Sequence, residues 1–181
     1  MKNTLATIQA IAVVSLRDAR SVDGFKEGFI GRIQAIARAH DWVVNGKTAS
    51  SSLADLIRRQ VNPYASRDED ALIVEGPSIV LTPTQVHCLG LILHELATNA
   101  TKHGALARPG ANVTIRWRLD PRAGRVLLGW TERGGPPVNV PERKGFGSRL
   151  VEQMTETLGG DFRAFFEREG FRAEVEFPLP R

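Results

Sequence analysis

Apolar and polar side chains in the first 46 residues follow the spacing of amphipathic helices. Apolar positions fall three and four residues apart over 5–19 and again over 25–43, which predicts two helices. The intervening RSVDG contains a capping Ser or Asp and a Gly, so it predicts a turn. We therefore expect an antiparallel helical hairpin over 1–46. Its apolar stripes need a partner, and a second copy forming a four-helix bundle is the simplest one.

The rest of the chain mixes helical and strand periods. NGKTASSS predicts a linker, and Ser52 with Asp55 predicts a capped helix over 53–60. Two longer helical runs follow, from about Pro83 to Lys102 with a stop at Gly104, and GFGSRLVEQMTETLGG. ALIVEG, NVTIRWRL, RVLLGWTE, DFRAFFERE and FRAEVEF read as strands, most with apolar side chains alternating to one face. The pattern predicts an α+β chain, with the hairpin followed by an α/β sandwich over 47–181.

One helix carries polar side chains where its pattern is otherwise apolar. In QVHCLGLILHELATNATKHGAL, a step of about 100° per residue places Asn99 near +40° and Lys102 near −20° of Glu95. The apolar positions cluster on roughly the opposite side: Val86, Leu89, Leu93, Leu96, Ala97 and Ala100. The helix therefore combines a core face with a narrow stripe of an acid, an amide and an ammonium.

Two interpretations of this stripe are open. It is an ordinary solvated face with a Glu–Lys pair, or it is a site for a Mg²⁺-triphosphate. Mg²⁺ prefers hard oxygen ligands and keeps several waters. A carboxamide oxygen would supply one direct ligand, a carboxylate would orient a metal-bound water or take a proton, and an ammonium would neutralise phosphate.

Two further motifs favour the nucleotide interpretation. Glu132 ends the strand RVLLGWTE and is followed by Arg-Gly-Gly-Pro-Pro. A carboxylate there can accept a hydrogen bond from the amino group of adenine, and glycines let backbone approach the ring. Gly145, Phe146 and Gly147 open a predicted helix, and such an opening presents backbone N–H groups to an anion.

Composition limits the kinds of partner and the cellular compartment that we expect for this protein. The net charge of +4 comes from scattered arginines, and the 7% of aromatic residues are not interleaved with them, so we expect no nucleic-acid partner. No apolar run is long enough to cross a bilayer, so we expect no membrane contact by this segment. The single cysteine, Cys88, excludes intrachain disulfides. We read it as a core side chain and expect a cytoplasmic protein.

Together these stretches resemble the kinase core of the HWE family of sensor histidine kinases, over nearly the whole chain. The family is named for a His in the first ATP box and a Trp-x-Glu in the second. They match His94 in HELATNATKHGAL, and Trp130 and Glu132 in WTERGGPPV. GFGSRLVEQM matches the third box. MKNTLATIQAIA resembles the start of the phosphoacceptor helix, and GRIQAIARAHDWV the second helix of the dimerisation hairpin.

The resemblance implies a Bergerat-type (GHKL) ATP-binding fold, a mixed sheet with helices on one face, that binds ATP and Mg²⁺. Nucleotide would lie between the helix 83–102, a lid over about 133–146 and the Gly-x-Gly helix. Asn99 would ligate Mg²⁺, Glu95 would act near the metal or as a base, and Lys102 would contact phosphate. Glu132 would read adenine. The other site residues implied are His94, His103, Trp130, Gly134, Gly135, Gly145, Phe146, Gly147 and Ser148. For His94, about 100° from Glu95 around the helix, a structural and a catalytic role both stay open.

The family's phosphoacceptor motif is His-Arg-x-Lys-Asn. The matching sequence in this chain begins at the third position of that motif, with Met1. We therefore expect the acceptor histidine two residues ahead of this chain. His40 on the second hairpin helix is expected at a packing or surface position, and His103 in contact with the helix dipole.

Three functions are compatible with this pattern. The first is a sensor kinase core that autophosphorylates a histidine and passes the phosphoryl group to a response-regulator aspartate. It implies a receiver-domain partner and a homodimer through the hairpin. The second is a degenerate scaffold that docks a response regulator without phosphoryl chemistry. The third is a serine kinase of anti-sigma type on the same ATP fold.

Overall fold

The computed structural model of the chain describes residues 8–9, 12–13, 15–16, 21–45, 52–65, 71–138, 140 and 145–179. Several predicted features lie outside the described residues: most of the first hairpin helix, residues 46–51 of the predicted linker, lid positions 139 and 141–144, and the side chains of His40 and Phe146. The predicted domain boundary near residue 46 falls in one of these gaps and stays a prediction.

The core of the described part is a mixed five-stranded sheet in the order β1-β2-β3-β5-β4. The strands are β1 (Leu72–Glu75), β2 (Asn112–Asp120), β3 (Arg125–Arg133), β4 (Asp161–Glu167) and β5 (Gly170–Pro178). β1 runs parallel to β2 and the other pairs are antiparallel. The predicted alternation is confirmed, because the inward positions of the three central strands are buried: Val113, Ile115, Trp117, Val126, Leu128, Trp130, Ala173, Val175 and Phe177.

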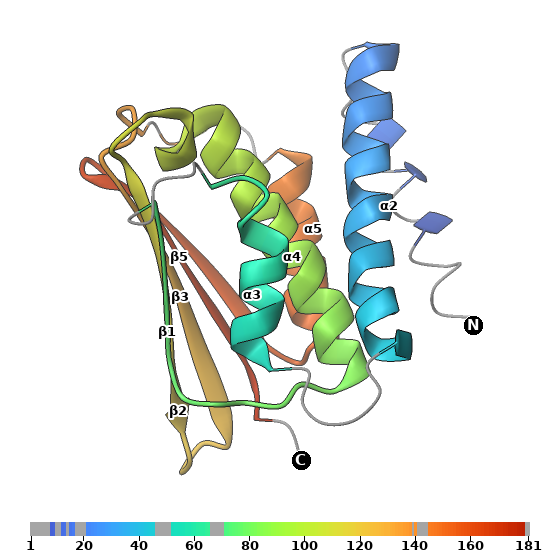
Figure 1. Cartoon of the computed structure of the whole chain (residues 1–181), viewed down its shortest axis with the longest axis vertical. Coiled ribbons are helices and arrows are strands. Elements are labelled where there is room, and N and C mark those ends of the chain that lie inside the picture. The colour runs from blue at the N-terminus through green and yellow to red at the C-terminus, as the bar shows by residue number, and fades with distance from the viewer. Residues whose placement is uncertain are drawn as a thin grey trace.

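Three helices cover one face of this sheet (Figure 1): α3 (Leu53–Val61), α4 (Pro83–His103) and α5 (Phe146–Thr157). The predicted Ser52 cap is confirmed, since its hydroxyl accepts from the backbone N–H of Asp55. α4 begins with a capping box between Thr82 and Gln85. It lies between α3 and α5 and contacts both, which buries the apolar positions predicted for its core face.

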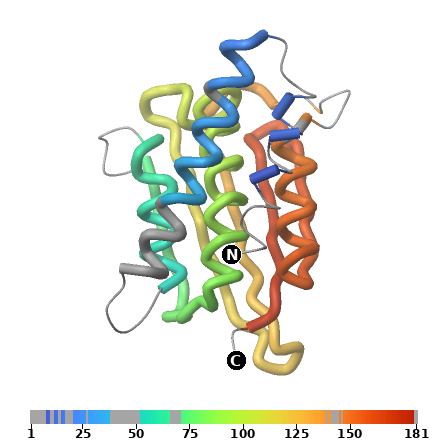
Figure 2. Tube along the Cα trace, turned by 90° about the vertical axis from the view of Figure 1, so that its right-hand side faces the viewer, coloured from blue at the N-terminus to red at the C-terminus, as the bar shows by residue number. Residues whose placement is uncertain are grey.

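α2 (Val22–Asn45) forms an outer layer that lies across α4 (Figure 2). Its start corrects the sequence prediction for RSVDG. The hydroxyl of Ser21 accepts from the N–H of Gly24, so Gly24 belongs to the first helical turn and not to the preceding loop. The described pieces of the first hairpin helix, 8–9, 12–13 and 15–16, are helical and lie beside α2.

Among the described helices, none combines the length and the hydropathy that a bilayer crossing requires. Cys88 is buried in the core as predicted, and burial raises the pKa of its thiol to about 11.

Candidate nucleotide site

The polar stripe of α4 is only partly open to solvent. Asn99 and Lys102 are exposed, whereas the side chain of Glu95, one turn before Asn99, is only 3% exposed. The interpretation of the stripe as a solvated Glu–Lys pair is wrong, because the ion pair of Glu95 is formed with Arg32 of α2. Glu95 is therefore held inside the protein beside an exposed amide and ammonium.

The start of α5 lies directly against this stripe. A Cβ on Gly147 would stand 2.7 Å from Oε2 of Glu95 and 3.6 Å from Nδ2 of Asn99, so only a glycine fits there without a shift. The N-cap residue Gly145 makes no side-chain capping bond. Gly145 therefore caps none of the first backbone N–H groups of α5 with a side chain, and a helix N-terminus favours an anion. Ser148 is half-buried in this first turn.

Glu132 comes from the end of β3 and lies in the core, 3% exposed. Its Oε2 accepts from the backbone N–H of Ala105 at 2.8 Å, and its Oε1 accepts from Nε1 of the fully buried Trp130 at 3.0 Å. Burial raises the pKa of Glu132, while the two hydrogen bonds act to lower it. The Glu132 side chain of the Trp-x-Glu motif thus connects β3 by a hydrogen bond to the turn that follows α4.

Gly104 ends α4 as predicted, but for a different physical reason than a left-handed cap. Its φ is −119°, which any residue adopts. A Cβ at this position would collide with Oε2 of Glu132, so the glycine is needed for close approach.

The two glycines after Glu132 also serve close packing. Gly134 has a φ of 76°, which favours glycine. A Cβ on it would lie 3.1 Å from Ala111, and a Cβ on Gly135 would lie 2.9 Å from backbone atoms of Ala105. The structure therefore brings Trp130, Glu132 and both glycines together around the end of α4, as one group of predicted residues.

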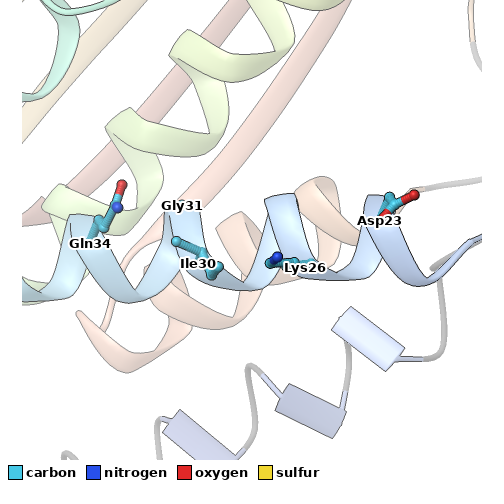
Figure 3. A pocket seen from close by; sticks show the side chains of 5 residues that line it. All are labelled: Asp23, Lys26, Ile30, Gly31 and Gln34. Carbon is cyan, nitrogen blue, oxygen red and sulfur yellow. The ribbon is translucent and has the colours of Figure 1, made fainter.

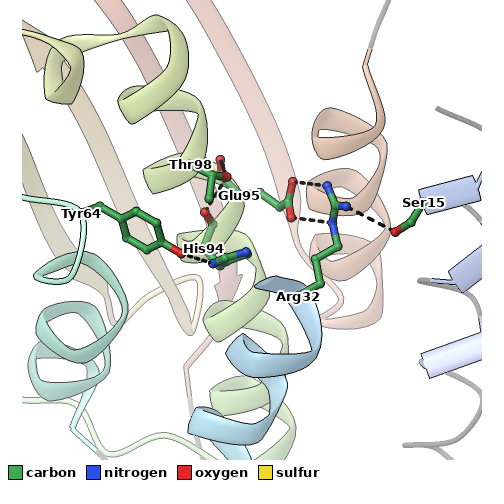
Figure 4. A network of polar contacts seen from close by, with 6 residues as sticks. All are labelled: Ser15, Arg32, Tyr64, His94, Glu95 and Thr98. Carbon is green, nitrogen blue, oxygen red and sulfur yellow. Dashed lines mark hydrogen bonds and ion pairs between the residues drawn. The ribbon is translucent and has the colours of Figure 1, made fainter. Parts of the chain in front are cut away.

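His94 is buried, and its ring points toward Tyr64 (Figure 4). Its Nδ1 shares a hydrogen bond of 2.8 Å with the hydroxyl of Tyr64, and its Nε2 would be 3.3 Å from a Cβ on Gly31 of α2. These contacts favour the structural interpretation of His94. His103 is exposed in the last turn of α4, next to Lys102.

Arg32 is the residue of this region that the sequence analysis missed. Its Nε donates to Oε1 of Glu95 at 2.8 Å and its Nη2 donates to Oε2 at 3.1 Å, across 63 residues of sequence. The position of Arg32 in the sequence could have indicated its role. Arg32 lies three residues after Phe29 and four before Ile36, which places a guanidinium on the apolar stripe of the hairpin helix.

Mg²⁺ is compatible with this set of groups. Among the described residues, no three His, Cys, Asp or Glu side chains gather as a metal cluster. A nucleotide-bound Mg²⁺ needs only one or two protein oxygens, because phosphates and water supply the rest. The exposed carboxamide of Asn99, with the Glu95 carboxylate one turn away, meets that need. A cavity of about 410 Å³ along Asp23, Lys26, Ile30, Gly31 and Gln34 lies on α2 (Figure 3) and does not include these residues.

The chain is similar in sequence to known histidine kinases. The sequence profile described as HWE histidine kinase matches residues 1–78. Blue-light-activated histidine kinase 1 of Erythrobacter litoralis is 35% identical over 182 residues, covering 98% of this chain and 50% of that protein. A blue-light-activated histidine kinase of Rhizobium johnstonii is 34% identical over 178 residues, with the same coverage. The chain thus spans about half the length of these relatives.

Solved structures show the same fold. The histidine kinase domain of the blue-light-activated histidine kinase of Erythrobacter litoralis superposes with a TM-score of 0.67 over 96% of both chains, at 16% identity. The catalytic domain of the histidine kinase ThkA gives a TM-score of 0.53 over 71% of this chain and 94% of its own, at 16% identity. The fold is therefore that of histidine kinase catalytic domains, a mixed sheet with helices on one face, which confirms the predicted fold class. The chain is thus similar to HWE histidine kinases over residues 1–78 and to blue-light-activated histidine kinases over 98% of its length.

Proposed function

We propose that this chain is the core of a sensor histidine kinase. It binds Mg²⁺-ATP on the side of α4 that carries Asn99. It transfers the γ-phosphoryl group to a histidine of its own protein, from which the group passes to an aspartate of a response-regulator receiver domain. Phosphoryl transfer of this kind needs mainly positioning and charge stabilisation, and the residues of α4 and α5 are suited to supply both.

The proposal gives each part of the site a task. The carboxamide oxygen of Asn99 holds Mg²⁺, which neutralises charge on the phosphates. Lys102, exposed in the last turn of α4, contacts phosphate as a point charge. The first turn of α5, which contains Gly147, donates backbone N–H groups to the same phosphates. Glu95 orients a metal-bound water or accepts a proton, and Glu132 reads the amino group of adenine.

A single observation carries this function: a Cβ on Gly147 would stand 2.7 Å from Oε2 of Glu95 and 3.6 Å from Nδ2 of Asn99. These residues belong to two motifs about fifty positions apart, and their closeness supports a site that combines oxygen ligands with backbone N–H groups. A scaffold without nucleotide chemistry has no need for this combination. The relatives named above are histidine kinases, which supports the histidine kinase over the serine kinase.

The response regulator and a second copy of this chain are the partners we propose. Val13, Leu16, Val22 and Ile30 are exposed large apolar side chains on the helical hairpin. A hairpin that leaves such a surface open is suited to pairing with its own copy in a four-helix bundle. Because the proposed reaction consumes ATP, we place the core in the cytoplasm.

The test is chemical labelling with γ-labelled ATP. The chain as given should bind Mg²⁺-ATP. A version extended by a segment that ends in His-Arg directly before Met1 should become labelled. The label should be labile in acid and stable in base, as expected of a phosphoramidate. Acid-stable label would favour the serine kinase instead, and absence of Mg²⁺-ATP binding would contradict the kinase itself.

A further inference from the structure

The carboxylate proposed to act on the nucleotide is held by a residue of the helical hairpin (Figure 4). Both oxygens of Glu95 accept hydrogen bonds from the guanidinium of Arg32, at 2.8 and 3.1 Å. The pair is well shielded from water, with 14% of the Arg32 side chain and 3% of the Glu95 side chain exposed. A paired, charge-assisted contact of this geometry is among the stronger polar interactions in proteins.

The same guanidinium extends the contact to a third element. Nη1 of Arg32 donates to the hydroxyl of Ser15 at 3.3 Å, and Ser15 lies on a described piece of the first hairpin helix. One residue thus joins both helices of the hairpin to α4. Close packing of Gly31 against His94, 3.3 Å for an added Cβ, shows that the hairpin is seated directly on the neighbouring turn of α4.

This arrangement conflicts with the task proposed for Glu95. A carboxylate that orients a metal-bound water or accepts a proton needs an oxygen that water or the nucleotide can reach, and the Glu95 side chain is only 3% exposed. Here both oxygens are engaged by Arg32, and Oε2 also faces Gly147. The Arg32 guanidinium and a hydrated Mg²⁺ are both cations, and they would compete for the Glu95 carboxylate. The Arg32 contact and a working Glu95 therefore belong to two different states of the molecule.

We propose that Arg32 is a positioning residue of the nucleotide site, supplied by the helical hairpin, and that it locks Glu95 while the hairpin is docked. Release of the hairpin frees Glu95 for Mg²⁺-ATP, and bound Mg²⁺-ATP in turn weakens the docking. This coupling is reciprocal by thermodynamic necessity. The inference rests on the proposed function, because it assigns Glu95 to the nucleotide.

Removal of the Arg32 guanidinium should shift the equilibrium from the docked to the released state. In the docked state Glu95 would become a buried carboxylate without its cation, which is strongly unfavourable. In the released state Glu95 faces water and loses nothing. The substitution therefore raises the released fraction, and the apparent affinity for a ligand that needs this state rises with it. Coupling between two sites typically changes affinity by about 5- to 150-fold, so we expect about a tenfold gain.

The experiment measures binding of Mg²⁺-ATP and of Mg²⁺-free ADP by calorimetry, for the wild type and Arg32→Gln. Affinity for Mg²⁺-ATP should rise about tenfold, and affinity for Mg²⁺-free ADP should change much less, because ADP without the metal makes little demand on Glu95. Loosening of the fold would lower both affinities. The matched control is Arg116→Gln, which breaks the exposed pair of Arg116 with Glu75 and should leave both affinities unchanged.

Binding of Mg²⁺-ATP by the wild type and by Arg32→Gln tests the locking role and the kinase function separately. If the wild type binds Mg²⁺-ATP and Arg32→Gln binds it equally or more weakly, the locking role is overturned and the kinase proposal stands. If no variant binds Mg²⁺-ATP, both proposals are overturned. Should Arg32→Gln fail to fold, Ser15→Ala decides, since it removes only the third contact. If Ser15→Ala binds Mg²⁺-ATP more tightly than the wild type, even by less than tenfold, the locking role of Arg32 is supported. An affinity equal to that of the wild type overturns it.

Discussion

Substitution of Glu132 by Gln tests whether the Trp-x-Glu motif acts as a structural tie. The carboxylate accepts from two N–H donors, those of Ala105 and Trp130, and is 3% exposed. A carboxamide has one acceptor oxygen, so its NH₂ group must face one of these two donors. A hydrogen bond to a charged group contributes about 1.5–3 kcal/mol, and we therefore expect a loss of about 2 kcal/mol in unfolding free energy. Glu132→Ala would leave both donors unpaired and cost about twice as much.

Urea unfolding followed by tryptophan fluorescence measures this loss. The matched control is Glu75→Gln, since Glu75 also ends a strand, but its side chain is 57% exposed in its pair with Arg116. Exposed pairs contribute about 0–1 kcal/mol, so this variant should stay close to the wild type. Equal stability of Glu132→Gln and the wild type would refute the structural role of the two hydrogen bonds.

Nucleotide binding tests the second role proposed for Glu132. If its carboxylate also accepts from the amino group of adenine, Glu132→Gln should weaken ATP by about 1.5–3 kcal/mol. GTP should be affected much less, because guanine presents a carbonyl at that position. Calorimetry with both nucleotides on the folded variant makes the comparison, and equal losses for ATP and GTP would exclude adenine readout.

The pH dependence of stability gives a further check on Glu132. Burial raises its pKa above the ordinary value of 4.5, so the folded state binds the proton more tightly than the unfolded state. The stability contributed by this group is therefore full below pH 4.5 and is lost as the pH rises through the folded-state pKa. The difference in unfolding free energy between wild type and Glu132→Gln should widen as the pH falls from neutral towards 4.5. A gap that narrows over this range would contradict the direction of the shift.

Three further substitutions or reagents probe separate parts of the molecule. Asn99→Ala should abolish Mg²⁺-dependent ATP binding at unchanged melting temperature, because Asn99 is exposed; unchanged affinity in calorimetry would remove the metal role. Tyr64→Phe should cost about 1 kcal/mol of stability through its lost bond to His94 and leave ATP affinity intact, whereas a large loss of affinity would give His94 a role in the site. Cys88, with its pKa raised to about 11, should resist thiol reagents until the chain unfolds; rapid labelling of the native protein would show that it is accessible.

Local periodicity determined the elements of this protein. The strand alternation in FRAEVEF and the core face of α4 depend only on how side chains repeat along a strand or a helix, and both were predicted correctly. The same holds for the Ser52 cap, because caps act within a few residues. The end of α4 at Gly104 was also predicted, although the glycine is needed there because a Cβ would collide with the distant Glu132. The same helical spacing placed Glu95, Asn99 and Lys102 on one polar stripe, and the use of this stripe for Mg²⁺-ATP stays a prediction.

Only the tertiary structure decided how these groups are used. The burial of Glu95 depends on Arg32, which is 63 residues away, and no local pattern reports that a hairpin helix lies across α4. Glu132 was read as an open carboxylate at a strand end, yet it accepts from Ala105 across 27 residues because β3 and the end of α4 are brought together. Contacts between distant elements depend on the packing of whole layers. The sequence therefore determined which polar groups α4 and β3 carry, and the packing of α2 and β3 against α4 decided which of them are exposed.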